Sequence, residues 1–177
     1  MDLPVRKNLR LKGYDYSSGG LYFITICVKD KHEMLGQVVG ANCVRPILSE
    51  YGNVVEMEIA ALSETYDAIE VINHVVMPNH IHMVISIDNY WQTQATDERS
   101  TIYGGRTTKN GRTQFAPTVS RIIKQFKGSI TKKIGASIWQ RTYHDHIIRD
   151  ERDYCRIAEY IENNPLKWTE DIYFNQR

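Results

Sequence analysis

Residues 69–87 read IEVINHVVMPNHIHMVISI, and this stretch decides the fold class. Its first half is rich in β-branched residues, and Pro78-Asn79 is a turn signal. In its second half, His80 and His82 lie on one face of a predicted strand, while the apolar residues between them face the other way. Two strands joined by so short a connection predict an antiparallel hairpin.

Outside this hairpin, the chain alternates between strand-like and helix-like patterns. The predicted strands are 21–28, a weaker 33–39, 69–77, 80–87 and 138–149, the last with a turn inside it. The predicted helices begin after Pro46 and end near Tyr66, begin after an N-cap at Thr118, and span 151–163. This order predicts an α+β fold, with a ferredoxin-like antiparallel sheet and helices on one side.

Length and composition are those of one globular domain spanning residues 1–177, with a long loop at about 88–117. The three cysteines have no short paired spacing, which is typical of reduced thiols rather than of a disulfide or zinc framework. The sequence shows neither a signal peptide nor an apolar run of membrane-spanning length, so we expect a cytoplasmic protein without a membrane partner.

The net charge of +1 conceals an uneven distribution of charge. Residues 99–144 contain ten lysines and arginines and no aspartate or glutamate. A segment of one sign inside a neutral protein indicates a surface that meets an anion, and nucleic acid is the leading candidate. The alternative is a solvated helix and a flexible loop that both happen to be basic.

His80 and His82 are the first candidates for chemistry. Residues two apart on a strand share a face and lie roughly 7 Å apart, so their imidazoles can converge on one divalent ion. A third ligand would have to come from elsewhere in the chain. A histidine pair without a metal is the alternative interpretation of the same pattern.

Tyr160 and Asn164 are the second candidates. They are four residues apart in a predicted helix and therefore lie on one face, one turn from each other. The asparagine offers a carbonyl oxygen to a metal, and the tyrosine offers a hydroxyl that needs a nearby cation or base before it can act as a nucleophile. The alternative is a packed aromatic residue followed by a helix C-cap before Pro165.

Two further segments carry polar residues suited to phosphate contacts. One is the cationic side of the helix after Thr118, and the other precedes the last helix. The candidate DNA-binding residues are Arg121, Lys124, Lys127, Arg141, His146 and Arg149.

Three stretches, in this order, resemble the single-tyrosine HUH transposases, and most of all the REP-associated tyrosine transposases. They are VVMPNHIHMVI (75–85), IWQRTYHDHIIRDERDY (138–154) and YIENNPLKW (160–168). The resemblance extends from about Tyr14 to Trp168. The long loop at 88–117 departs from compact family members, so the resemblance does not extend to the choice of DNA site.

The resemblance implies a mechanism and a set of roles. His80, His82 and Asn164 would bind the metal, which in this family is Mg or Mn, and Tyr160 would be the nucleophile. The protein would bind hairpin-bearing single-stranded DNA, cleave it through a 5′-phosphotyrosine intermediate that frees a 3′-OH, and rejoin strands. The family's fold is a ferredoxin-like palm, and some members are monomers while others are homodimers.

Two other functions are compatible with the same residues. A domesticated protein could hold structured single strands without cutting them, and would then show salt-dependent binding but no covalent adduct. A metal hydrolase of small substrates could use His80 and His82 and would turn over without DNA. The intact set of Tyr160, Asn164 and the histidine pair favours the nuclease and strand transferase.

Overall fold

The computed structural model describes residues 19–40, 43–87, 106–107, 113–114 and 118–174. The strands are β1 (Gly20–Cys27), β2 (Gly36–Gln37), β3 (Ile47–Leu48), β4 (Ile69–Val76), β5 (His80–Ile87), β6 (Arg106–Thr107), β7 (Thr113–Gln114) and β8 (His144–Ile148). The helices are α1 (Glu50–Thr65), α3 (Val119–Ile134) and α4 (Glu151–Asn163), with short 3-10 helices η1 (Lys29–Lys31) and η3 (Trp168–Glu170).

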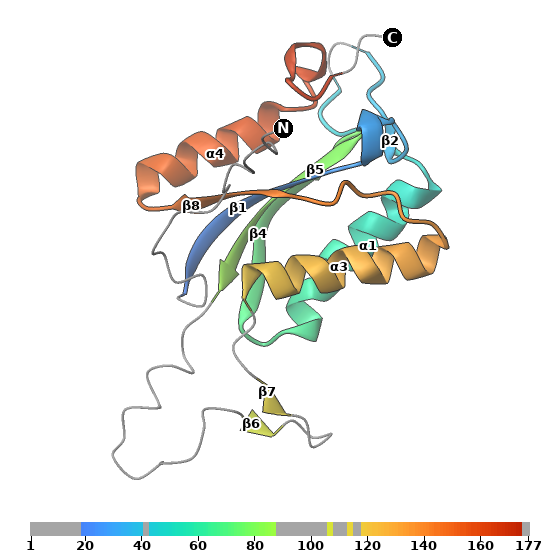
Figure 1. The fold of residues 1–177 in the computed structure, drawn as a ribbon. Coiled ribbons are helices and arrows are strands. Elements are labelled where there is room, and N and C mark those ends of the chain that lie inside the picture. The colour runs from blue at the N-terminus through green and yellow to red at the C-terminus, as the bar shows by residue number, and fades with distance from the viewer. Residues whose placement is uncertain (1–18, 41–42, 88–105, 108–112, 115–117, 175–177) are drawn as a thin grey trace, which may run out of the picture.

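The main sheet consists of four antiparallel strands in the order β4-β5-β1-β8 (Figure 1). β4 and β5 form the predicted hairpin around Pro78-Asn79. The register of β1 against β5 places Thr25 opposite His82. On its other side, β1 pairs with β8, where Phe23 lies opposite His146. β1 therefore brings residues from both neighbouring strands onto a shared face of the sheet.

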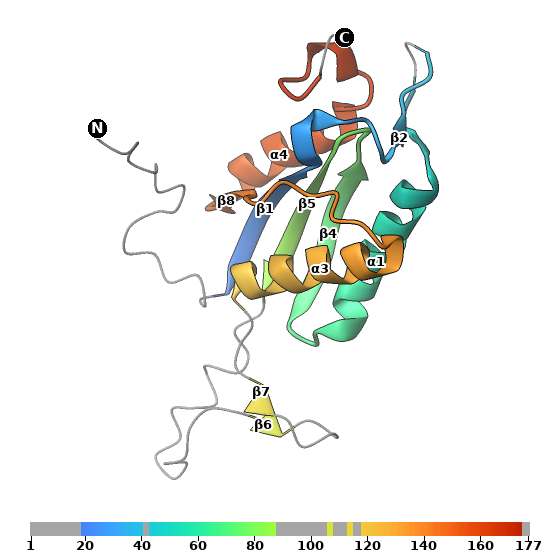
Figure 2. The ribbon, with the colours of Figure 1, turned by 45° about the vertical axis from the view of Figure 1, so that its right-hand side comes forward.

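The two faces of this sheet are covered by different helices (Figure 2). On one face, residues such as Ile24 of β1 pack with α1 and α3 in the larger hydrophobic core. On the other face, Phe23 of β1 and Val84 of β5 pack against α4, which contributes Ile157 and Ile161. Successive strand residues point to opposite faces, so one strand supplies both cores.

The predicted α+β class and the antiparallel sheet are confirmed, but the helices do not all lie on one side. α4 covers the face opposite α1 and α3. The physical reason is that both faces of the sheet carry apolar side chains, Phe23 and Val84 among them, and each apolar face needs its own covering layer.

Most predicted elements are found where the sequence placed them, with some differences in length. Thr118 is the N-cap of α3, where its hydroxyl accepts a hydrogen bond from the Arg121 backbone N–H. α4 has the predicted bounds, and Asp150 caps it by accepting from the Asp153 N–H. The predicted strand at 138–149 is shorter and forms β8, and the weaker strand at 33–39 is reduced to β2, which pairs with β3.

The predicted loop at 88–117 lies largely outside the described residues, as do residues 1–18. Its described parts are β6 and β7, which pair with each other. All three cysteines are free. Within the described ranges, no helix combines the length and the apolar character needed to cross a membrane.

Candidate functional site

His80 and His82 lie side by side on β5, on the face that α4 covers. Their Nε2 atoms are 3.0 Å apart and their ring centroids 4.5 Å apart. The two side chains are 0% and 1% exposed, respectively. The predicted convergence of the two imidazoles is therefore present in the folded chain.

Asn79 fixes the proton position on His80. Its side-chain Nδ2 donates to the carbonyls of Lys31 and Tyr173, at 3.1 and 2.9 Å. Those two bonds leave its Oδ1 as an acceptor 2.8 Å from His80 Nδ1, so Nδ1 must carry the proton. A neutral His80 then has its lone pair on Nε2, the nitrogen that faces His82.

Thr25 of β1 contacts the other side of His82. Its Oγ1 lies 2.8 Å from His82 Nδ1, and it is also hydrogen-bonded to the Tyr173 side chain. Since His80 Nε2 is an acceptor, the short distance between the Nε2 atoms implies that His82 donates from Nε2 to His80. His82 Nδ1 then accepts from the Thr25 hydroxyl.

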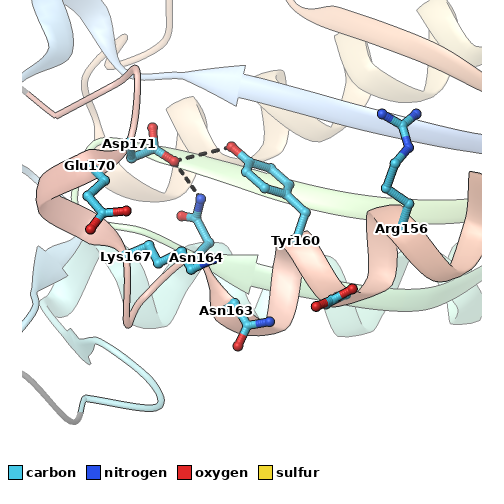
Figure 3. A pocket seen from close by; sticks show the side chains of 8 residues that line it. Arg156, Tyr160, Asn163, Asn164, Lys167, Glu170 and Asp171 are labelled. Atoms are coloured by element: carbon cyan, nitrogen blue, oxygen red, sulfur yellow. Dashed lines mark hydrogen bonds between the residues drawn. The ribbon is translucent and has the colours of Figure 1, made fainter.

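Tyr160 lies on α4 and Asn164 is the C-cap residue of this helix, and Figure 3 shows both side chains beside Asp171. The Tyr160 hydroxyl lies 3.2 Å from His82 Nε2, and the tyrosine is 40% exposed. Asn164 is 2% exposed, and its Oδ1 is buried without a hydrogen-bond partner among the described residues. The helix therefore brings a partly accessible hydroxyl and an unpaired carbonyl oxygen to the histidine face. The four-residue spacing predicts that these two residues share one side of the helix.

Asp171, which the sequence analysis did not single out, completes this cluster. Its Oδ2 accepts from the Tyr160 hydroxyl at 3.2 Å and from Asn164 Nδ2, and its Oδ1 accepts from the Tyr173 N–H at 2.7 Å. Ligand atoms of His80, His82 and Asp171 all lie within 4.8 Å of one another. The chain reversal at η3 brings this carboxylate back toward β5.

Burial sets the protonation states in this cluster. It lowers the pKa of His80 to about 3, with a smaller contribution from Lys31, and it lowers the pKa of His82 well below its usual range. Burial, together with the charge of Asp171, raises the pKa of Tyr160 above its ordinary value. At neutral pH the imidazoles are therefore uncharged and the Tyr160 hydroxyl keeps its proton.

These donors fit a divalent cation. Two neutral imidazole nitrogens, an unpaired amide oxygen and a carboxylate oxygen form a mixed nitrogen and oxygen set, which suits Mn²⁺ and, through its oxygens, Mg²⁺. The decisive observation is the buried Asn164 Oδ1, because a buried carbonyl oxygen without a partner is costly. A cation between the histidines and α4 would give that oxygen a partner.

An open pocket of about 280 Å³ adjoins Tyr160. Arg156 lies one turn before Tyr160 on α4, and Lys167 follows the end of the helix; both line the pocket (Figure 3). The acidic residues of the pocket are Glu159, Glu170 and Asp171. The hydroxyl thus opens onto a surface that carries charges of both signs.

Comparison with known proteins assigns the chain to a family. No protein-family model matches it. A Haemophilus influenzae protein of uncharacterised function is 33% identical over 171 residues, which cover 94% of this chain and 91% of the relative. A second H. influenzae protein, whose name assigns it to the REP-associated tyrosine transposases, is 28% identical over 153 residues, covering 86% and 74% of the two chains.

A solved structure of a REP-associated tyrosine transposase bound to a REP hairpin shares the fold. It has a TM-score of 0.56 at 20% identity, covering 85% of this chain and 68% of that chain. The chain belongs to the REP-associated tyrosine transposase family.

The candidate DNA-binding residues of this family member lie on both sides of the sheet. Arg121 and Lys124 are exposed on α3, on the face away from Tyr160. His146 lies on the same face as α4 and pairs with Asp153 at 2.7 Å. The remaining exposed candidates are Arg141, before β8, and Arg149, after it.

Lys127 differs from the other candidates because its ammonium has internal partners. It donates to the carbonyls of Gln140 and Thr142, at 3.0 and 2.9 Å, and lies over the Tyr143 ring. Burial lowers its pKa to about 8.

Site residues that were not predicted from the sequence include Arg156, Lys167 and Asp171. Arg156 could have been found from its spacing, because it lies four residues before Tyr160 on the same helical face. Lys167 and Asp171 follow the helix, where no periodic pattern indicates which way a side chain faces.

Proposed function

We propose that this transposase-family protein is a metal-dependent nuclease and strand transferase that acts on hairpin-bearing single-stranded DNA. Tyr160 would be its nucleophile, and His80, His82 and Asn164 would hold a divalent metal, Mg or Mn. The observation that carries the proposal is the 3.2 Å approach of the Tyr160 hydroxyl to His82, one helical turn from the unpaired Asn164 oxygen. A cytoplasmic location is part of the proposal.

In the cleavage step, Tyr160 Oη attacks the scissile phosphorus. The Oη–P bond forms, the bond from phosphorus to the 3′ oxygen breaks, and that oxygen takes up a proton from solvent, so the products are a 5′-phosphotyrosine and a free 3′-OH. A bound metal supplies Lewis-acid polarisation of the phosphate. Since the fold raises the pKa of Tyr160, the hydroxyl needs an acceptor for its proton as it attacks. Asp171 Oδ2 is in position to receive that proton.

The second step reverses the first with a different strand. A 3′-OH attacks the phosphotyrosine, the P–Oη bond breaks, and Tyr160 recovers its proton while the strands are joined. The tyrosyl ester conserves the energy of the phosphodiester bond, so joining requires no nucleotide triphosphate. The 40% exposure of Tyr160 leaves room for DNA to reach its hydroxyl.

The test is a denaturing gel that detects protein covalently joined to DNA. The full chain is incubated with Mn²⁺ or Mg²⁺ and a hairpin-bearing single strand taken from beside its own gene. We expect an adduct with the wild-type protein and none with Tyr160→Phe, which removes only the hydroxyl. Tyr154→Phe, on the same helix, is the matched control and should retain the adduct.

Two results would contradict the proposal. An adduct that persists in Tyr160→Phe would show that another residue is the nucleophile. Salt-dependent binding of the hairpin by the wild-type protein, with no adduct under either metal, would show a binding protein that does not cut.

A further inference from the structure

Asp171 reaches the cluster from outside the motif that holds Tyr160 and Asn164. It follows η3, and Figure 3 shows its carboxylate beside both of those side chains. Its oxygens lie close enough to His80 and His82 for all three residues to share one cation. The two histidines come from β5, so a shared ion would join the sheet to the segment after α4.

The hydrogen bonds of Asp171 leave its negative charge without a cationic partner. Its partners within the described residues are the Tyr160 hydroxyl, the Asn164 amide and the Tyr173 N–H, all of which are neutral. The Lys31 ammonium donates instead to the Ile172 carbonyl. A partly buried carboxylate that is surrounded only by neutral donors is well placed to bind a cation.

Asn164 provides a second, independent observation. Its amide donates to Asp171 through Nδ2, while its Oδ1 is buried without a partner. A carboxylate has about four lone-pair positions on its two oxygens, so it can bind a cation and still accept from Tyr160. The unneutralised carboxylate and the side chain with the unpaired amide oxygen are therefore direct neighbours in this cluster.

We propose that Asp171 is a metal ligand of this protein, additional to His80, His82 and Asn164. The inference rests on the proposed function, because it takes the histidine pair to be a metal site. It gives the site a negatively charged donor, which favours hard divalent cations such as Mn²⁺ over softer ones. It also places one ligand beyond the end of the helix that carries the nucleophile.

The experiment measures Mn²⁺ binding by the full chain, without DNA, using calorimetry and the electron paramagnetic resonance signal of free Mn²⁺. Asp171→Asn keeps the size of the side chain but removes its charge, and we expect the Kd to rise at least about tenfold. Glu170→Gln is the matched control, because Glu170 lines the same pocket and its exchange removes the same charge. For that control we expect a change of less than about twofold, since Glu170 is not part of the cluster of possible ligands.

The double variant His80→Gln with His82→Gln separates the two proposals. If it loses Mn²⁺ binding while Asp171→Asn binds as tightly as the wild type, Asp171 is not a ligand and the histidine site stands. If the double variant binds as tightly as the wild type, the histidine metal site fails, and the role of Asp171 fails with it. Asp171→Ala should reproduce the loss seen with Asp171→Asn, and circular dichroism checks that each variant is folded.

Discussion

Thr25 supports His82 from β1 in a way that only a hydroxyl can. Without a metal, His82 Nε2 donates to His80, and its Nδ1, 2.8 Å from Thr25 Oγ1, accepts from the hydroxyl. If a cation takes the Nε2 lone pair, the proton must move to Nδ1, and Thr25 must then accept. A hydroxyl can both donate and accept a hydrogen bond, whereas a backbone carbonyl could only accept one.

Thr25→Val should therefore weaken the binding of a metal without changing the shape of the strand. Partners that orient a ligating histidine are typically worth about 10- to 100-fold in metal affinity, so we expect the Mn²⁺ Kd to rise by at least about tenfold. Calorimetry on the full chain measures this. Thr25→Ser keeps the hydroxyl and should bind nearly as the wild type does. Equal affinities for the valine and serine variants would rule out an orienting role.

At the scale of residues, the sequence predicted the pairs that have a local period. His80 and His82 share a strand face because strands alternate, and Tyr160 and Asn164 share a helix face because helices repeat about every 3.6 residues. The prediction that these two pairs come together rested also on the family resemblance, because no local pattern indicates that α4 packs on the histidine face. Asp171 was missed because its position depends on the reversal at η3, which follows no period.

At the scale of elements, Lys127 joins α3 to the segment that leads into β8. Its ammonium donates to the carbonyls of Gln140 and Thr142, from the side of the helix that meets this segment. The sequence pattern placed Lys127 among the outward cations because it lies off the apolar stripe of α3. The pattern could not show that the chain returns alongside the helix and offers two carbonyls to the side chain.

We therefore expect Lys127→Met to reduce the stability of the protein. The change leaves two carbonyls without their donor, and such losses typically cost about 1–3 kcal/mol in the free energy of unfolding. Urea denaturation measures the effect. Lys124→Met, on the same helix but exposed, is the control and should change stability by about 0.5 kcal/mol or less. If both variants unfold alike, the contacts of Lys127 add nothing to stability.

The face of the sheet that α4 covers also could not be predicted from the sequence. The sequence predicted the bounds and the apolar stripe of this helix, but it assigned all helices to one face. An apolar stripe shows that a helix packs against another element, but it does not show which face of the sheet the helix covers. Here Phe23 and Val84 provide the apolar surface that α4 covers, and they lie on the histidine face.

At the scale of the whole molecule, the sheet separates two groups of cations. Arg121 and Lys124 are exposed on α3, whereas Arg156 and Lys167 line the Tyr160 pocket on the opposite face. DNA that contacts both groups must pass around an edge of the sheet. Within the described residues, the acid-free segment noted in the sequence supplies the exposed cations of α3, which lie on the side of the sheet away from Tyr160.

Two double variants separate binding from chemistry. Each neutralised phosphate contact contributes roughly 0.7 to the slope of log affinity against log salt for a single strand, so removing two contacts should lower the slope by roughly 1.4. We expect this decrease from Arg121→Gln with Lys124→Gln and also from Arg156→Gln with Lys167→Gln, measured by fluorescence anisotropy with the hairpin strand. At saturating DNA, only the pocket pair should slow adduct formation, because only those cations lie beside Tyr160. If the α3 double variant leaves the slope unchanged, the DNA contacts only the α4 face. If the same variant slows adduct formation at saturating DNA, the α3 cations affect the chemical step from the opposite face of the sheet.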